Sequence, residues 1–195
     1  MPFTFAGINE YVSPRVTEVK VCGASDVLSE FPSALHWISS IGLRSMFHGV
    51  PYPSVRHWAI QFVRHIERAL VCYSDARTQL LGLVTEHRTQ WSPYFRALSY
   101  FEDSAVHLYQ AFASHMKMSG KRFFKGRDGS PLQRLNVLYN AVKHASAGSE
   151  QPIWITDEGL HSEEAVISFI EFEELLRECA RSAAAVCRGA DAHEG

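Results

Sequence analysis

The chain has 195 residues, of which 46% are hydrophobic and 21% are charged, and its net charge is −2. This length suits one domain or one domain with an extension, and the composition excludes wholesale disorder and the need for a disulfide framework. No stretch reaches the ~18 uninterrupted apolar residues of a membrane span, and the start lacks a signal-peptide pattern, so a cytoplasmic protein is expected.

Charge is distributed unevenly along the chain. Residues 1–149 contain 16 Lys and Arg against 10 Asp and Glu, whereas residues 150–195 contain 3 against 11. An acidic segment on a basic body either screens an anion site in the same molecule or solvates a terminal helix, and both alternatives stay open here.

The N-terminal part predicts an arm that leads into a helical domain. Residues 1–24 mix Gly, Pro and Thr with single apolar residues and show no sustained period, whereas residues 25–195 read as one helical-bundle domain. Pro32 is expected in the first turn of a helix that ends near the glycine of HGVPYP.

Two long amphipathic helices are predicted in the middle of the chain, from about residue 54 to 88 and after Ser92. Their apolar residues recur at threes and fours, and the short connection predicts antiparallel packing. The expected inner residues are Trp58, Ala59, Phe62, Ile66, Ala69, Leu70 and Tyr73 on the first helix, and Phe95, Leu98, Phe101, Ala105, Leu108, Tyr109 and Phe112 on the second.

The last third predicts a helix, a small hairpin and a final helix. Ser130 as N-cap and Pro131 at the first position open a helix that is expected to run to residue 147. PIWIT and AVISF, separated by DEGLHSEE, predict a β-hairpin, and EFEELLRECARSAAAVC predicts a last amphipathic helix. The predicted fold is all-α, an antiparallel four- to five-helix bundle with a small β-hairpin before the last helix.

The helix that begins at Pro131 has a polar face that is a candidate site. Leu135, Leu138 and Val142 gather on one side of it, and the other side presents Asn136, Asn140, Lys143 and His144. These four side chains are expected to meet one ligand together. The alternative is the ordinary wet face of an amphipathic helix.

A basic loop precedes this helix. Basic residues with interleaved Phe123 and Phe124 suit a single-stranded nucleic acid, whose phosphates need neutralising and whose bases stack, and the loop leads to a helix N-terminus that attracts phosphate. The alternative is a solvated surface loop with both Phe packed on the bundle. The predicted nucleic-acid-binding residues are Lys117, Lys121, Arg122, Lys125 and Arg127.

The order of two long helices, a basic loop, a helix with "YNAVKH", then "PIWITDEGL" and an acidic last helix resembles the HEPN superfamily of prokaryotic helical-bundle proteins over roughly residues 54–188. The resemblance implies a homodimeric RNA-binding protein of a toxin or phage-defence system, often an RNase. The family hallmark is an Arg followed after four to six residues by a His, whereas nine residues separate Arg134 from His144 here. Only the Asn and His of "YNAVKH" match, as a variant motif.

Metal-independent RNA cleavage needs a base, an acid and positive charge on the phosphorane. His144 is the candidate base or acid, with its copy in a dimer in the other role. Lys143 and Arg134 are candidates for stabilising charge, and Asn140 for orienting His144 or the scissile phosphate. The alternative function is a non-catalytic helical module for dimerisation or binding of a protein partner.

Neither a metal nor a cofactor is expected. His57 and His65, and separately His107 and His115, are eight apart along their predicted helices. A di-iron bundle needs Glu followed three residues on by His on two helices, and the only match, Glu158 to His161, is broken by Gly159 in a predicted turn. Cys22, Cys72, Cys179 and Cys187 contain no CxxC pair and are expected to be reduced and mostly buried.

Overall fold

The computed structural model describes residues 16, 19–47, 56–85, 92–122, 126–144 and 153–188. The helices within these ranges are η2 (Leu28–Glu30), η3 (Ala34–His36), α2 (Trp37–Phe47), α3 (Arg56–Thr85), α4 (Ser92–Ser119), α5 (Pro131–Lys143) and α6 (Phe169–Arg188). The strands are β1 (Trp154–Ile155), β2 (Gly159–His161) and β3 (Val166–Ser168), which precede α6. The predicted helical bundle with a small β element before its last helix is confirmed.

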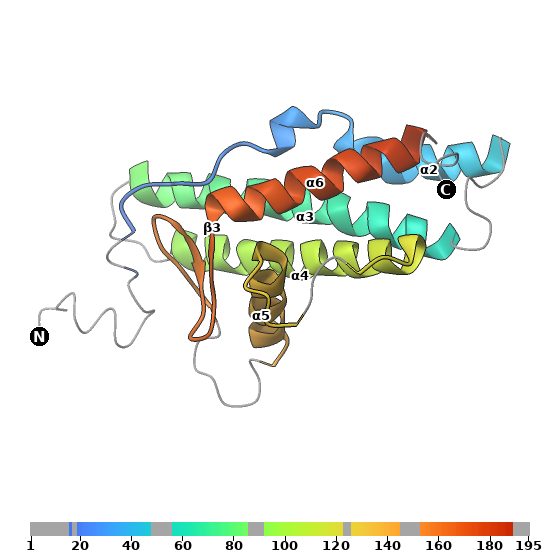
Figure 1. The fold of residues 1–195 in the computed structure, drawn as a ribbon. Helices are drawn as coiled ribbons and strands as arrows, with labels where there is room; N and C mark the ends of the chain where they lie inside the picture. The colour runs from blue at the N-terminus through green and yellow to red at the C-terminus, as the bar shows by residue number, and fades with distance from the viewer. Residues whose placement is uncertain are drawn as a thin grey trace, which may run out of the picture.

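The α3–α4 pair is the centre of the molecule. Figure 1 shows the two helices lying side by side and antiparallel, as the short connection between them predicted. Phe62, Ile66 and Tyr73 of α3 and Phe101 of α4 are almost fully buried. The expected position of Phe95 on the inner face is wrong, because its side chain is 41% exposed and its neighbour Tyr94 fills the core instead.

The remaining elements cover two sides of this pair. In Figure 1, α6, α2 and the segment that leads to α2 lie on the α3 side, and the shorter α5 lies beyond α4, steeply inclined to it. The segment at residues 19–31 crosses α3 in extended and 3-10 conformation rather than as an α-helix, and α2 begins only at Trp37. Val19, Ala24 and Val27 of this segment belong to the common core.

The sheet has three antiparallel strands in the order β1-β2-β3. The predicted hairpin placed GLH in its turn, whereas these residues form the middle strand, with His161 opposite both Trp154 and Val166. Gly159 permits this arrangement because a Cβ there would overlap the backbone of Ile167 and Ser168. Residues 159–161 therefore form a strand close to the backbone of β3, where a loop had been predicted.

The helices next to the sheet have the caps that their sequences favour. The Ser130 hydroxyl accepts a hydrogen bond from the Gln133 amide, with Pro131 at the first helical position as predicted. At the start of α6, Ser168 and Glu171 form a reciprocal capping box, because each side chain accepts a hydrogen bond from the other residue's amide. These caps fix where α5 and α6 start.

The cysteines form no disulfide; Cys72 and Cys179 are buried, and Cys22 and Cys187 are half-buried. The expectation that the cysteines are mostly buried therefore holds for two of the four. Among the helices that the structure describes, none combines the length and the apolar character that crossing a membrane requires.

Candidate functional site

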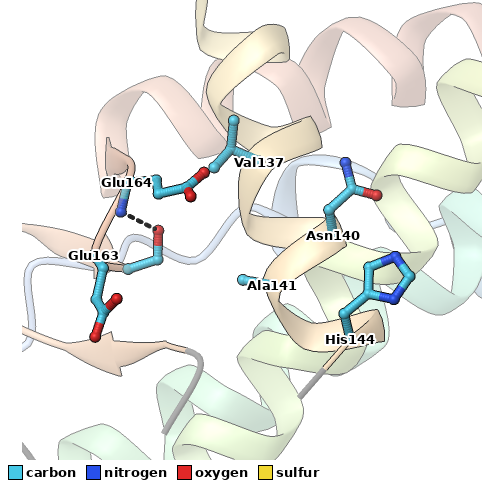
Figure 2. A pocket seen from close by; sticks show the side chains of 7 residues that line it. Val137, Asn140, Ala141, His144, Glu163 and Glu164 are labelled. Atoms are coloured by element: carbon cyan, nitrogen blue, oxygen red, sulfur yellow. Dashed lines mark hydrogen bonds between the residues drawn. The ribbon is translucent and has the colours of Figure 1, made fainter. Parts of the chain in front are cut away.

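A surface cavity of about 330 Å³ lies between the C-terminal half of α5 and the turn that joins β2 to β3. Val137, Asn140, Ala141 and His144 line it from α5, and Ser162, Glu163 and Glu164 line it from the turn. Figure 2 shows Asn140 and His144 on one side of the last turns of α5 and the two carboxylates on the other, with Val137 and Ala141 between them. The cavity therefore contains two of the residues that the sequence singled out.

Helix geometry explains why these α5 residues meet. Positions 137, 140, 141 and 144 follow the i, i+3, i+4, i+7 pattern of one helix face. His144 is the C-cap residue, and its amide donates to the Asn140 carbonyl at 3.0 Å. The predicted helix was longer, but α5 ends at Lys143, and residues 145–152 lie outside the described ranges. The Asn140 side-chain amide donates to Asn136 at 3.3 Å rather than to the imidazole.

The acidic side of the cavity is a fixed turn. The buried Ser162 hydroxyl accepts hydrogen bonds from the amides of Glu164, at 3.3 Å, and of Ala165, at 3.0 Å. This arrangement holds Glu163 and Glu164 with their side chains exposed at the rim. Two carboxylates thus face a cavity whose α5 side offers an amide and an imidazole, so the field there favours a cation over a phosphate.

Lys143 turns away from this cavity. Its ammonium lies 5.9 Å from the centroid of the Tyr139 ring. Tyr139 in turn stacks on Tyr109 of α4, with ring centroids 4.4 Å apart. The side chain therefore lies over an aromatic pair between α4 and α5, a geometry in which a cation is attracted to the ring face.

Arg134 contacts α6 instead of the cavity. Its guanidinium forms an ion pair with Glu171 and donates to the Gly129 carbonyl at 2.6 Å. Burial would raise the pKa of Glu171, but hydrogen bonds from Ser168 and Arg134 outweigh it, so this pKa lies below its ordinary value. The structure therefore separates Arg134 from His144, and its charge is neutralised within the bundle.

The basic loop lies at the opposite end of α5. Lys117, Lys121, Arg122 and Arg127 are exposed, whereas Lys125 and the adjacent Phe123 and Phe124 lie outside the described residues. The 13 residues of α5 span about 20 Å between the loop side and His144. The predicted basic residues and the predicted catalytic face consequently do not line one groove.

A second cavity, of about 280 Å³, adjoins the N-terminus of α5. Ser130 and Pro131 line it together with Glu171, Glu174 and Glu178 of α6. The sequence predicted that this helix end would attract phosphate, and three carboxylates face it in the structure. Of the two alternatives for the acidic C-terminal segment, this placement favours screening of an anion site in the same molecule.

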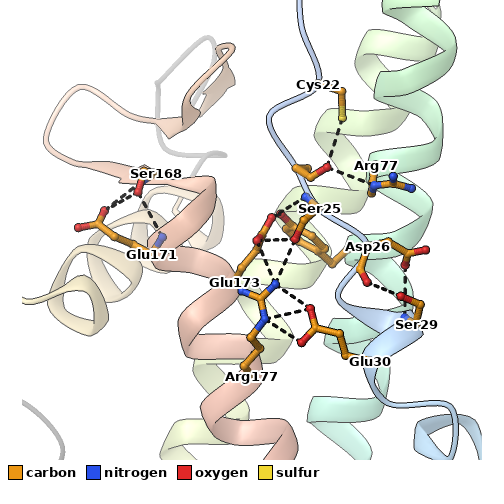
Figure 3. Close-up of polar contacts among 12 residues, drawn as sticks. Cys22, Ser25, Asp26, Ser29, Glu30, Arg77, Ser168, Glu171, Glu173 and Arg177 are labelled. Atoms are coloured by element: carbon orange, nitrogen blue, oxygen red, sulfur yellow. Dashed lines mark hydrogen bonds and ion pairs between the residues drawn. The ribbon is translucent and has the colours of Figure 1, made fainter.

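Glu173 is a buried polar residue that the sequence reading missed (Figure 3). It accepts hydrogen bonds from the Ser25 amide and hydroxyl, both at 2.6 Å, and from the Tyr73 hydroxyl at 2.7 Å. Arg177, which forms a bidentate ion pair with Glu30, also donates to Glu173 at 3.4 Å. The available signal was a Glu on the apolar stripe of α6, directly after Phe172.

In the described part of the chain, no three His, Cys, Asp or Glu side chains lie close enough together to hold a metal ion. Comparison with family models, with curated proteins and with solved structures finds no match to this chain.

Proposed function

We propose that the protein is a non-catalytic helical module that binds a basic protein segment in the cavity between α5 and the β2–β3 turn. The observation that carries this proposal is the presence of Glu163 and Glu164 opposite Asn140 and His144. A guanidinium or ammonium group entering there would gain the two carboxylates of the β2–β3 turn. Its aliphatic stem would pack on Val137 and Ala141.

The same geometry argues against RNA cleavage centred on His144. Cleavage needs positive charge at the phosphorane, but Arg134 is paired with Glu171 and Lys143 lies over Tyr139. A phosphate next to His144 would instead meet Glu163 and Glu164. Asn140 and His144, the two residues of the variant motif, would then belong to the binding surface of the cavity.

The basic segment that we propose as the occupant is the 117–127 loop of a second copy of the chain. In one molecule the loop and the cavity lie at opposite ends of α5, about 20 Å apart. Two copies related by a two-fold axis, with their α5 helices antiparallel, would place each loop on the other copy's cavity. The positive N-terminal end of each α5 helix would then lie next to the negative C-terminal end of the other, which is a favourable arrangement of the two helix dipoles.

Sedimentation and light scattering at low and high salt would test this arrangement with charge-reversal variants. Glu163→Arg with Glu164→Arg, and separately Lys121→Glu with Arg127→Glu, should each weaken the dimer at least ~10-fold, because like charges then meet. The combination of all four changes should restore association, since the signs are exchanged. Asp75→Arg with Glu158→Arg is the control for the change in net charge, because both residues are exposed and neither lines a cavity at α5.

A wild-type protein that is monomeric at all concentrations would overturn the homodimer. Association that is equally sensitive to the control and to the cavity variants would show that net charge alone is at work. If the protein is monomeric, yet a lysine- or arginine-rich peptide binds it and this binding needs Glu163 and Glu164, the occupant is another protein.

RNA binding by the basic loop is a second candidate, and the exposure of Lys117, Lys121, Arg122 and Arg127 supports it. Fluorescence anisotropy with single-stranded RNA should then show affinity that falls steeply with salt. Lys121→Ala with Arg122→Ala should weaken it, whereas His144→Ala should not. RNA that is released with cyclic phosphate ends in EDTA, and only when His144 is present, would instead establish the RNase.

A further inference from the structure

One histidine of α3 and one histidine of α4 contact each other between the two helices. His65 of α3 and His107 of α4 face each other with their Nδ1 atoms 3.1 Å apart and their ring centroids 5.3 Å apart. Both side chains are half-buried. In the sequence, His65 is eight residues from His57 and His107 is eight residues from His115. Neither the proposed dimer nor the cavity at α5 uses this pair.

Both rings are neutral near pH 7. Burial lowers the pKa of His65 to about 4, with further lowering by His107 and Arg64. Burial also lowers the pKa of His107, although the Asp103 carboxylate opposes the shift. One neutral ring then donates its Nδ1 proton to the Nδ1 lone pair of the other. Neutral imidazole is also the form that binds a metal ion.

The spacing of the two nitrogens matches the spacing that a metal ion requires. Zn²⁺ binds histidine nitrogen at about 2.0–2.1 Å, which puts two nitrogens of a tetrahedral site about 3.3–3.4 Å apart. The observed 3.1 Å is close to this edge, so small ring rotations would direct both lone pairs to one point. We propose that His65 and His107 form a two-histidine binding site for a borderline divalent cation such as Zn²⁺, linking α3 to α4.

Binding requires a change of tautomer and no net loss of a proton. The ring that carries hydrogen on Nδ1 moves it to Nε2 through solvent, and the two freed Nδ1 lone pairs bind the ion. Water completes the coordination, since the described residues supply no third His, Cys, Asp or Glu. Asp103, one turn before His107 on α4, is within electrostatic range of that ring and favours a cation there, whereas Arg64 and Arg68 act on the same ring and oppose it. The expected affinity is therefore modest.

Such an ion would stabilise the fold, because the two ligands are 42 residues apart in sequence and are brought together only in the folded state. Two protein ligands hold an ion less tightly than the four of a structural zinc site. The site would therefore be populated at an excess of metal and would raise the melting temperature as the metal concentration rises.

The test is a titration of the metal-free protein with ZnCl₂ at pH 7.5, followed by calorimetry and by thermal unfolding. Wild type should bind about one Zn²⁺ per chain and gain at least ~2 °C in Tm at a ten-fold excess over the dissociation constant. His65→Gln and His107→Gln should each lose this response. Both variants keep an amide that can hydrogen-bond the remaining ring, so each should fold. His57→Gln, which changes an exposed histidine of α3, is the matched control.

Loss of the zinc response in both pair variants, with retention in His57→Gln, is the expected result. An equal response in all four proteins would overturn the proposal by assigning zinc to other side chains. Absence of any response in wild type would show that the pair is a neutral hydrogen bond between helices and nothing more. None of these results depends on whether the protein forms the proposed dimer.

Discussion

Glu173 illustrates how much a single buried carboxylate can hold together. It is 5% exposed and accepts hydrogen bonds from Ser25 and Tyr73 on two other segments, while Arg177 stands one turn further on α6. Burial raises the pKa of Tyr73, and the hydrogen bond to Glu173 raises it further, so the Tyr73 hydroxyl remains a donor across the ordinary pH range. These polar contacts are nearly inaccessible to water, and a buried polar group that loses its hydrogen bond there carries a large free-energy cost.

We expect Glu173→Gln to lower the free energy of unfolding by about 2–4 kcal/mol, because an amide nitrogen then faces groups that donate and the charge opposite Arg177 is lost. Denaturant unfolding measures this. Glu174→Gln removes a charge from the next, exposed position and should change stability by less than about 0.5 kcal/mol. Equal effects in the two variants would contradict the role assigned to Glu173.

Glu102 gives the molecule a pH dependence of opposite sign to that of most carboxylates. Burial raises its pKa to about 7, with a further contribution from Asp103, against 4.5 for the unperturbed group. Between these two values the folded state binds more protons than the unfolded state, so the contribution of Glu102 to stability falls as pH rises through this window. Above about pH 7 the loss is complete.

Glu102→Gln should therefore raise stability at pH 8, by on the order of 1–3 kcal/mol, and leave it nearly unchanged at pH 4. Unfolding curves at several pH values for the variant and for wild type would show it. The difference between the two proteins should grow between pH 4.5 and 7. A difference that is the same at every pH would mean that packing, rather than ionisation, is responsible.

At the scale of elements, the β2–β3 pair depends on one glycine. A Cβ at Gly159 would overlap the backbone of Ile167 and Ser168, which cannot move without disturbing the start of α6. By contrast, a Cβ at Gly82 within α3 would meet no atom within 4 Å. The two glycines therefore offer a matched comparison.

We expect Gly159→Ala to destabilise the protein by about 1–3 kcal/mol or more through overpacking. Gly82→Ala should stabilise it by roughly 0.5–1 kcal/mol, because alanine has the higher helix propensity. Thermal or denaturant unfolding of both variants decides the matter. Similar signs for the two changes would refute the close backbone approach at Gly159.

The two long helices were predictable because their apolar stripes are long and regular. The middle strand was not, since Gly159, Leu160 and His161 carry a turn-like glycine and no alternation, and only pairing with both neighbours makes them a strand. For the site, the face with Asn140 and His144 was predictable from helix spacing. Its acidic partners were not, because Glu163 and Glu164 reach it through the tertiary fold, and Arg134 is diverted by Glu171.

At the scale of the whole molecule, residues 19–31 are packed into the bundle. The predicted boundary of the arm falls at residue 24, but Val16, Val19 and Ala24 are buried in the common core. The Asp157 carboxylate accepts hydrogen bonds from the amides of Lys20 and Val21, at 2.6 and 3.0 Å. This segment therefore connects the sheet to the α3 side of the bundle.

Removal of residues 1–24 should lower stability by at least about 3 kcal/mol, since each buried valine contributes roughly 1.5–3 kcal/mol. Asp157→Ala, which removes only the two amide contacts, should cost less, about 1–2 kcal/mol. Unfolding of both proteins in urea provides the comparison. A shortened protein as stable as wild type would show that residues 1–24 are a separate arm, as the sequence predicted.

The partners of Ser25 and Glu30 have a consequence for biosynthesis. Ser25 bonds to Glu173, 148 positions later, and Glu30 bonds to Arg177, 147 positions later, both on α6. At about 5–20 residues per second, the ribosome adds Glu173 and Arg177 roughly seven to thirty seconds after Ser25. During translation the segment that contains Ser25 and Glu30 has none of these bonds. They form only when the last helix, α6, has been made. The α3–α4 hairpin, whose contacts are nearer in sequence, is free to form first.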